Sequence, residues 1–279
     1  MVQLNPDRNF HFELLRVLAS ARGSGADIAE ILNISDQIEP GNFESWYENF
    51  NDLATWILST LDPKHDYDKA TLRDAYLRNH HCVGAMDSLF DKATAMMDPS
   101  PERRSLKADG FEVPVIFFRA SPTSEPRPVL IIGNGLDGSM EEMFHFHGLQ
   151  ALEIGYHVVL YEGPGQCTVR RQQNLGFIHD WERVVTPVID YLCSLAIVDQ
   201  KRIGLLGNSL GGYLAARAAA FERRIAATIL IDDLFDVYAQ LSDLLPTEGG
   251  GACGSRERET VQRISGEANE QIHQYEMVD

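Results

Sequence analysis

Between residues 110 and 231 the chain repeats one pattern, in which a short apolar run is followed by a turn and then by an amphipathic stretch of helical length. The apolar runs are EVPVIFF (112–118), PVLII (128–132), HVVLY (157–161), RIGLL (202–206) and AATILI (226–231). The helices between them are expected at about 139–154, 178–196 and 209–222. Strands that alternate with helices of this length form βαβ units, so the pattern predicts an α/β fold with a mostly parallel sheet and helices on both faces. Nearly unbroken apolar runs indicate strands that are buried on both sides.

The residues before this pattern are helical in character. Residues 43–61 carry aromatic and aliphatic side chains at spacings of three and four, which gives the helix one broad apolar face. Asp62-Pro63 is expected to end this helix, because the residue before a proline avoids the helical conformation. A second helical stretch is expected over residues 71–97. The sequence therefore predicts a helical region ahead of the sheet.

Three regions follow from these patterns. The run DPSPERRS (98–105) is expected to be a linker, which places a helical N-terminal domain at residues 1–108 and an α/β core at residues 109–245. Residues 246–279 are expected to form a flexible linker and a C-terminal helix, whose narrow apolar stripe is typical of packing on its own core or on a partner. Since no strand is predicted after residue 231, the sheet is expected to be incomplete at its C-terminal edge.

The charge balance excludes several classes of function. The chain has 41 acidic and 24 basic side chains, a formal charge of −17 that repels nucleic-acid phosphates and anionic membrane surfaces. No run approaches the ~18 apolar residues of a membrane span, and the N-terminus does not resemble a secretory signal. The four cysteines are widely spaced, so neither a zinc site nor a redox pair is expected, and the cytoplasm is the expected location. His145 and His147 lie two residues apart, on different faces of a helix, so no metal site is expected there either.

Residues 207–211 read Gly-Asn-Ser-Leu-Gly and lie between RIGLL and the alanine-rich helix former LGGYLAARAAAF. This order of strand, tight turn and helix is what a nucleophile elbow requires. The serine of an elbow has a strained backbone, so the residues two before and two after it must be small, as Gly207 and Gly211 are. The helix N-terminus beneath Ser209 would offer N–H groups and a positive dipole end to an oxyanion. The alternative interpretation is a glycine turn with a capping serine.

A second glycine-rich loop, Gly133-Asn134-Gly135-Leu136-Asp137-Gly138, follows the apolar run 128–132 directly, and Ser139 with Glu142 fits a capping box for the next helix. In an α/β-hydrolase the loop at this place supplies one oxyanion N–H, and the residue after the nucleophile supplies another. The candidate donors are Leu210, Gly135 and Leu136. A dinucleotide-binding turn is the weaker alternative, because the next strand is followed by another turn, Glu162 to Gly165.

A resemblance to a known family is carried by four runs: GNGLDGSMEEMFHF, GYHVVLYEGPGQCTVRRQQ, GFIHDWERVVTPVIDYL and DQKRIGLLGNSLGGYLAARAAAFERRIAA. They resemble the fungal α/β-hydrolases of secondary metabolism, a group that includes the polyketide-shortening pigment hydrolases and the fusarin-type hydrolases. FHFELLRVLASA, GADIAEIL and FESWYENF resemble the helical N-terminal domain of that group, so the likeness covers roughly residues 9–238. It implies a hydrolase fold with Ser209 as the nucleophile, acting without a cofactor on polyketide or hybrid metabolites by C–C, ester or amide chemistry.

The groups that would activate the serine are less evident in the sequence. A serine hydroxyl attacks when a histidine takes its proton and a carboxylate holds that histidine, and in this fold the chain order is serine, acid, histidine. Of nine histidines, His273 alone follows Ser209, and Asp232 and Asp233 are the candidate acids at the end of the last predicted strand. His179 is interpreted as a structural histidine. Since the resemblance places the acid and the histidine on later strands, the chain is expected to be shortened at its C-terminus.

Three hypotheses from different classes follow. The first is an active serine hydrolase of a fungal pathway that acts on a small metabolite, with retro-Claisen chain shortening as the first reaction type and ester, lactone or amide chemistry, including ring closure, as the second. The second is a degenerate member that binds a pathway intermediate or assists its cyclisation without a full triad. The third is a truncated gene product of a normal hydrolase. A homodimer is left open as a partner arrangement.

Overall fold

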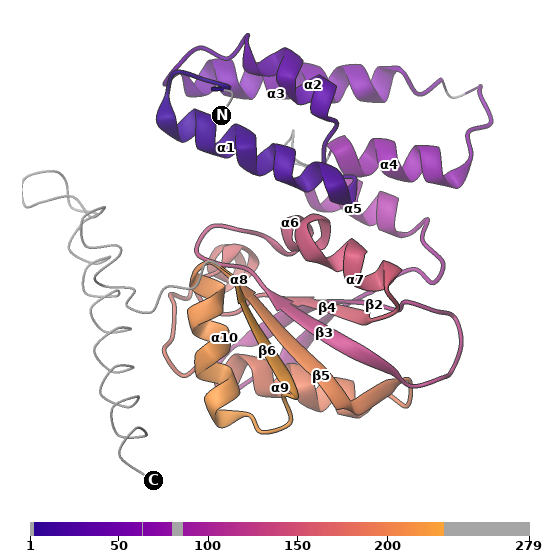
Figure 1. Cartoon of the computed structure of the whole chain (residues 1–279), viewed down its shortest axis with the longest axis vertical. Helices are drawn as coiled ribbons and strands as arrows, with labels where there is room; N and C mark the ends of the chain where they lie inside the picture. Colours follow the sequence, from indigo (N-terminus) through magenta and orange to yellow (C-terminus); the bar gives the residue numbers. More distant parts are fainter. Residues whose placement is uncertain (1–2, 63, 80–85, 232–279) are drawn as a thin grey trace, which may run out of the picture. The chain divides into compact units, whose positions relative to one another are not determined.

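The structure is a computed structural model that describes residues 3–62, 64–79 and 86–231 (Figure 1). Contacts divide the described chain into two units. The first consists of the residues up to 101 together with 118–122 and 141–154, and the second contains the other described residues. Each unit is described by itself.

The second unit is built on a six-stranded sheet whose order is β1-β2-β4-β3-β5-β6. Its strands are β1 (Glu102–Lys107), β2 (Glu112–Phe118), β3 (Arg127–Gly133), β4 (His157–Tyr161), β5 (Val198–Asn208) and β6 (Ala227–Ile231). β3 pairs in parallel with both β4 and β5, and β5 pairs in parallel with β6, whereas β1 is antiparallel to β2. The predicted α/β class with a mostly parallel sheet is confirmed, and each of the five predicted strands is present.

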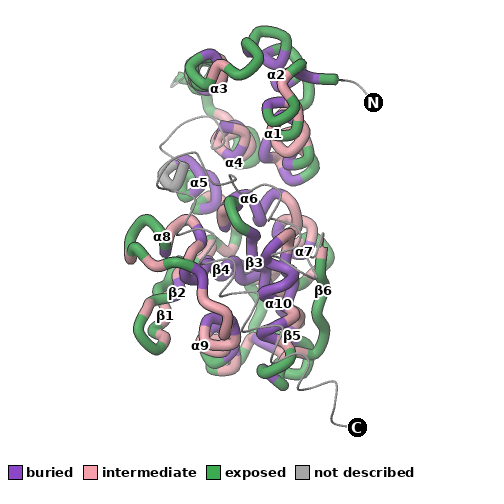
Figure 2. Tube along the Cα trace, turned by 90° about the vertical axis from the view of Figure 1, so that its left-hand side faces the viewer, coloured by how far each residue is buried: buried purple, intermediate pink, exposed green. Residues whose placement is uncertain are grey.

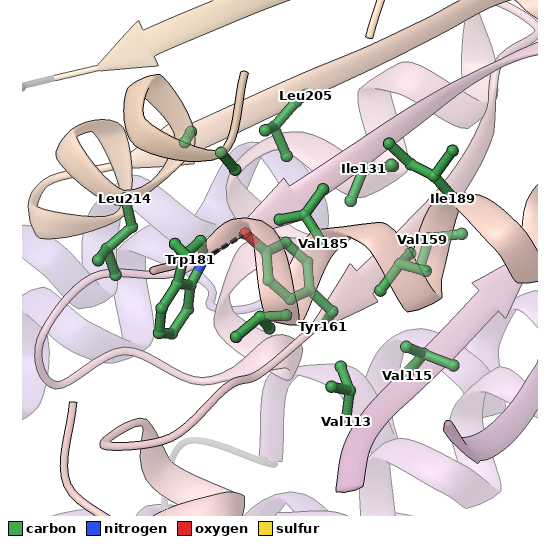
Figure 3. Close-up of a cluster of buried hydrophobic side chains, with 14 of the residues drawn as sticks. Val113, Val115, Ile131, Val159, Tyr161, Trp181, Val185, Ile189, Leu205 and Leu214 are labelled. Atoms are coloured by element: carbon green, nitrogen blue, oxygen red, sulfur yellow. Dashed lines mark hydrogen bonds between the residues drawn. The ribbon is translucent and has the colours of Figure 1, made fainter. Parts of the chain in front are cut away.

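One face of the sheet is covered by α9 (Glu182–Cys193) and α10 (Leu210–Phe221), with the short α8 (Cys167–Gln173) following β4. Apolar side chains of α9 and α10 share one buried cluster with inward-facing residues of β2 to β5, part of which Figure 3 shows. Alternate residues of the same strands, such as Ile132, Val158 and Leu160, are buried as well. The central strands are therefore buried on both faces, as their continuous apolar runs predicted.

The first strand, β1, was not predicted. The first four residues of its sequence, ERRSLK, lie in the run interpreted as a linker, and its residues are almost all exposed. Every residue of β1 nevertheless pairs with β2, from Glu102 opposite Phe117 to Lys107 opposite Glu112. Pairing to an existing apolar strand supplies the backbone hydrogen bonds, so an edge strand can form from residues that carry no alternating pattern.

The N-terminal part of the first unit, up to residue 101, contains six of the helical segments that the structure describes: α1 (Arg8–Ala19), the 3-10 turn η1 (Ser20–Gly23), α2 (Ile28–Ser35), α3 (Phe43–Ser59), α4 (Lys69–Asn79) and α5 (Met86–Thr94). Four of the helices begin at side chains that accept hydrogen bonds from the first turn, namely Asp7, Asp27, Asn42 and Asp68. Buried residues of α1, α2 and α3 form one apolar cluster around Phe10, Leu14 and Ile57. The apolar face predicted for residues 43–61 is buried in its middle, from Phe50 to Ile57, whereas Phe43 and Tyr47 at its start are exposed.

The helix expected over residues 139–154 is divided in three: α6 (Met140–Met143), a π-helical turn (Phe144–Gly148) and α7 (Leu149–Glu153). From Glu141 onward these residues belong to the first unit. The guanidinium of Arg16 in α1 donates to both carboxylate oxygens of Glu142, with Nη2 2.7 Å from Oε2. The buried ring of His145 donates from Nδ1 to the carbonyl oxygen of Gly23, 2.7 Å away. A segment between two strands therefore packs with the N-terminal helices.

The contacts place the unit boundaries differently from the predicted domains, because β1 pairs within the sheet and residues 141–154 pack with the helical unit. The predicted linker and helix at 246–279 lie outside the described residues. Among the helices that the structure describes, none is both long enough and apolar enough to cross a membrane.

Candidate active site

Ser209 occupies the turn between β5, which ends at Asn208, and α10, which begins at Leu210. Its backbone has φ 57° and ψ −130°, a combination that non-glycine residues rarely adopt. Two backbone hydrogen bonds hold it there: the Ser209 amide donates to the carbonyl oxygen of Ile231 at 2.7 Å, and the Gly212 amide donates to the carbonyl oxygen of Ser209 at 2.8 Å. Strained backbone of this kind persists where the surroundings over-determine it, and it is concentrated at functional sites.

The two glycines of the turn are required by close backbone approach. A Cβ atom added at Gly207 would lie 1.9 Å from the carbonyl oxygen of Gly211, and one added at Gly211 would lie 2.3 Å from the carbonyl oxygen of Asn134. Neither position has room for a side chain. The steric argument made from the G-x-S-x-G spacing therefore holds in the structure. A glycine turn with a merely capping serine would not require this close approach of backbone at both glycines.

The loop that follows β3 lies directly against this turn. A Cβ atom added at Gly135 would lie 3.0 Å from Ser209 Cβ and 3.3 Å from the backbone nitrogen of Leu210. Two of the three predicted oxyanion donors, Gly135 and Leu210, are thus brought together beside the serine. Leu136, the third, follows Gly135 in the same loop, and its side chain is 51% exposed.

A buried glutamine, which the sequence pattern did not single out, holds the loop by hydrogen bonds to its backbone. Gln166 lies in the turn after β4, and its side-chain Nε2 donates to the carbonyl oxygens of Asn134 at 2.7 Å and Gly135 at 3.2 Å. Its Oε1 accepts from the amide of Gly163 at 2.8 Å. One side chain therefore ties two consecutive carbonyl groups of the loop to the turn that follows the neighbouring strand.

A buried carboxylate continues this network. Glu162 comes immediately after β4 and is fully buried. Its Oε1 accepts from Asn134 Nδ2 and from the amide of Met140, both at 3.2 Å, and its Oε2 accepts from the amide of Thr168 at 2.6 Å. Met140 and Thr168 belong to the first turns of α6 and α8, where amide groups lack helical partners and the dipole favours an anion. The buried charge is therefore compensated by N–H donors.

Tyr161, the last residue of β4, fills the space beneath the start of the loop. A Cβ atom added at Gly133 would lie 2.7 Å from its hydroxyl oxygen. That oxygen accepts a hydrogen bond from Trp181 Nε1 at 3.0 Å, which is the dashed line in Figure 3. Burial raises the pKa of Tyr161 to about 12, and the Trp181 hydrogen bond opposes part of the increase. The hydroxyl is therefore a neutral packing and hydrogen-bonding group.

Comparison with known proteins places this arrangement in a family. The model of the family described as "Alpha/beta hydrolase family" matches residues 129–268, half of the chain. The chain belongs to the alpha/beta hydrolase family. The matched residues begin in β3, and they include the loop around Gly135 and the turn at Ser209.

Similar proteins are hydrolases of fungi. "Hydrolase ORFZ" of Pyricularia oryzae is 31% identical over 82% of this chain and 62% of its own length, and "Hydrolase acrC" of Aspergillus aculeatus is 32% identical over 85% of this chain and 65% of its own length. The chain thus spans less than two thirds of these relatives. The crystal structure of the 2,6-dihydroxy-pseudo-oxynicotine hydrolase matches 92% of this chain and 74% of its own with a TM-score of 0.67 at 22% identity, a likeness of fold. The resemblance to fungal alpha/beta-hydrolases is confirmed.

The structure brings together one half of the predicted site of this alpha/beta-hydrolase. Ser209, Leu210 and Gly135 lie side by side, whereas the predicted base and acids, His273, Asp232 and Asp233, lie outside the described residues. Among the described residues, no three histidine, cysteine, aspartate or glutamate side chains are grouped as a metal ion would require.

Sequence reasoning missed Glu162 and Gln166, because EGPGQ reads as a glycine turn. One signal was available. Glu162 directly follows HVVLY, a strand expected to be buried on both sides, and a carboxylate at that place must find donors inside the protein.

Proposed function

We propose that this protein is a serine hydrolase of fungal secondary metabolism, with Ser209 as its nucleophile and a small polyketide or hybrid metabolite as its substrate. One observation carries the proposal: a serine in a strained turn between a parallel strand and a helix, with the backbone of Gly135 packed against its Cβ atom. The fungal hydrolases that the chain resembles support the pathway.

The proposed chemistry is nucleophilic attack on a carbonyl carbon. Ser209 Oγ forms a bond to that carbon as its proton passes to a base, and the carbonyl oxygen becomes an oxyanion that accepts hydrogen bonds from Leu210 N–H and from the loop amides of Gly135 and Leu136. Collapse expels the leaving group with a proton, and water then hydrolyses the acyl-enzyme. Each N–H donor stabilises charge that exists mainly in the transition state, so it accelerates the step rather than merely binding substrate.

In this proposal His273 takes the proton from Ser209, and Asp232 or Asp233 holds that histidine. The first reaction type is a retro-Claisen cleavage, in which the leaving carbanion is stabilised by a β-carbonyl group and is protonated as it departs. Ester or amide cleavage, or capture of the acyl group by a hydroxyl of the same molecule to close a ring, is the second type. The proposed location is the cytoplasm, and a homodimer is the proposed assembly if a partner contributes to the site.

Covalent labelling with a fluorophosphonate tests the nucleophile. The expected result is one labelled site per chain, absent in Ser209→Ala, with the label found on the peptide that contains residue 209 by mass spectrometry. Ser139→Ala is a matched control, because that serine follows the same loop and is not part of the proposed chemistry. Loss of labelling in Ser139→Ala with labelling retained in Ser209→Ala contradicts the proposal.

The base is tested by the same reaction in His273→Ala. Since a neutral serine hydroxyl is a weak nucleophile, the expected labelling rate falls by about 10²-fold or more when the base is removed. An unchanged rate removes His273 from the mechanism. Wild-type protein that folds cooperatively and yet takes no label favours a member of the family that binds a metabolite without hydrolysing it.

A further inference from the structure

The side chain of Gln166 is in an unusual position for a residue with no proposed chemical role. It is buried, and it makes three hydrogen bonds to the backbone, two donated to the loop after β3 and one accepted from Gly163. Its amide orientation is fixed by its partners, because two carbonyl oxygens face Nε2 and an N–H group faces Oε1. A flipped amide would set oxygen against oxygen and nitrogen against nitrogen.

The two carbonyl groups that accept hydrogen bonds from Gln166 determine where the loop's N–H groups point. In a trans peptide the C=O and the N–H lie on opposite sides, so the Gly135 N–H points away from the Asn134 carbonyl oxygen, and the Leu136 N–H points away from the Gly135 carbonyl oxygen. Gln166 holds both carbonyl oxygens from one side. The two amides are therefore turned away from Gln166, as successive N–H groups are in anion-binding backbone concavities.

The other end of the loop is held by the Asn134 side chain. Its Nδ2 donates to the carbonyl oxygen of Gly138 at 2.6 Å and to Oε1 of Glu162 at 3.2 Å. These bonds close the loop on itself and attach it to β4. Glu162 and Gln166 are four positions apart along the chain. Together they fix the orientation of the loop, although neither side chain is one of the proposed oxyanion donors.

We propose that Gln166 is a positioning residue of the active site, which sets the direction of the Gly135 and Leu136 amides toward the oxyanion of the Ser209 reaction. This inference rests on the proposed function. Gln166 acts through backbone carbonyl groups, so its loss misdirects the N–H donors in the transition state and leaves ground-state binding of substrate largely as it was. The expected consequence is a fall in kcat with a KM that is little changed.

The informative substitution is Gln166→Glu, which keeps the shape and the oxygen that accepts from Gly163 but replaces the donor to both carbonyl groups with an acceptor. Gln166→Met is the second variant, because it removes the hydrogen bonds without adding a buried charge. Gln173 offers a matched control: its side chain also bonds a backbone amide and carbonyl, both of Glu112, at 2.9 and 2.8 Å, but at the start of β2. Gln173→Glu and Gln173→Met repeat each change away from the loop.

Two measurements on the full chain test the proposal. The first is the rate of fluorophosphonate labelling together with kcat and KM for an activated ester such as p-nitrophenyl acetate. Removal of one oxyanion donor typically costs about 10²-fold in kcat, so we expect a fall of about 10-fold to 10²-fold in the Gln166 variants, a KM within about threefold, and rates close to wild type in the Gln173 variants. The second is hydrogen exchange of peptides that cover residues 133–140, which we expect to become faster in the Gln166 variants alone.

The outcomes separate the two proposals. Wild-type protein that takes no label contradicts the proposed function. If wild type is labelled, Gln166→Met is labelled equally fast and residues 133–140 exchange as before, the proposed role of Gln166 is wrong. The proposal that Ser209 is the nucleophile is then unaffected. A raised KM with an unchanged kcat also overturns the role of Gln166, because that result describes a residue that helps to bind substrate and not one that orients the oxyanion donors.

Discussion

The two neighbours of β5, β3 with its following loop on one side and β6 on the other, are held in place by different interactions. On the β3 side, the loop from Gly133 to Gly138 is tied by buried hydrogen bonds of Glu162 and Gln166, and a Cβ atom added at Gly135 would be in tight contact with Ser209. On the other side, the residues of β6 are mostly exposed (Figure 2), and Ile229 is 46% exposed. Yet β6 provides the carbonyl oxygen that the Ser209 amide bonds. The serine turn therefore depends on side-chain contacts from one neighbour and on a backbone hydrogen bond from the other.

The largest effect is expected where backbone meets backbone. In Gly207→Ala the new Cβ atom would lie 1.9 Å from the carbonyl oxygen of Gly211, and since neither group can move as a flexible side chain does, the turn must open. We expect a loss of about 3 kcal/mol or more in the free energy of unfolding, together with loss of labelling at Ser209. Urea unfolding followed by tryptophan fluorescence measures the first quantity.

The control for this change is Gly176→Ala. An added Cβ atom at Gly176 has no neighbour within 4 Å, so the expected change in the free energy of unfolding is within about 0.5 kcal/mol. Equal losses in the two variants would mean that the close approach of Gly207 and Gly211 does not constrain the turn. A free energy of unfolding in Gly207→Ala close to that of wild type would also contradict this constraint.

The next comparison uses two residues that face each other across β5 and β6. Leu206 is 5% exposed and is paired in register with Ile229, which is 46% exposed. Leu206→Ala leaves a cavity in the core and is expected to cost about 2–5 kcal/mol, whereas Ile229→Ala removes a half-exposed side chain and is expected to cost about 1 kcal/mol or less. Similar losses in the free energy of unfolding, measured in urea, would show that side-chain contacts also hold β6. The two sides of β5 would then not differ.

Much of the fold could be predicted because it depends on local patterns. The continuous apolar runs of β3 and β4 predicted buried parallel strands within a residue or two. β1 could not be found in this way, because ERRSLK becomes a strand by pairing with β2 and not through its own residues. The π-helical turn at Phe144–Gly148 was also missed, since its apolar spacing within 139–154 suits an ordinary helix.

In the candidate active site, too, local sequence pattern allowed some features to be predicted and not others. The glycines around Ser209 could be interpreted from sequence, since the G-x-S-x-G spacing itself calls for small residues there; the structure adds a distant cause for Gly211, whose Cβ atom would meet the carbonyl oxygen of Asn134. Gln166 could not be interpreted in this way, because its partners, Asn134 and Gly135, are more than thirty residues away along the chain and lie opposite it only once β3 and β4 are paired. The spacing of small residues around Ser209 was predicted, and the side-chain hydrogen bonds that Gln166 makes to a distant loop were not.

A third test concerns the junction that leads from α10 to β6. The Arg224 side chain donates to both carboxylate oxygens of Glu222, and Thr186 Oγ1 donates to Oε2, so the pKa of Glu222 is lowered from 4.5 to about 2. A carboxyl group whose pKa is lower in the folded state stabilises that state above pH 4.5, and the contribution is lost as the pH falls toward 2. The Glu222 side chain is 7% exposed but its Arg224 partner is 40% exposed, so solvent screens the pair and the contribution is on the order of 1–2 kcal/mol.

Glu222→Gln is the variant that isolates this contribution. At pH 7 it is expected to be less stable than wild type, and the difference is expected to shrink as the pH is lowered from 4.5 toward 2, since wild type loses the charge that the variant never had. The free energy of unfolding in urea, measured at several pH values in both proteins, gives the comparison. A difference that stays constant over this range would show that the Arg224 contact does not depend on the charge of Glu222.

The smallest effect is expected beneath the loop from Gly133 to Gly138, in Tyr161→Phe. The change removes the acceptor of the buried Trp181 N–H and leaves the packing of the ring in place, so we expect a loss of about 1–2 kcal/mol at pH 7. The pH dependence identifies the hydroxyl, because a tyrosine whose pKa is about 12 in the folded state stabilises that state below pH 10 and loses this contribution as the pH rises toward 12. Wild type should therefore lose more stability than Tyr161→Phe between pH 10 and 12. Parallel curves of unfolding free energy against pH for the two proteins would mean that this hydroxyl is not desolvated. The core beneath Gly133 would then be more open than its close contact with Tyr161 indicates.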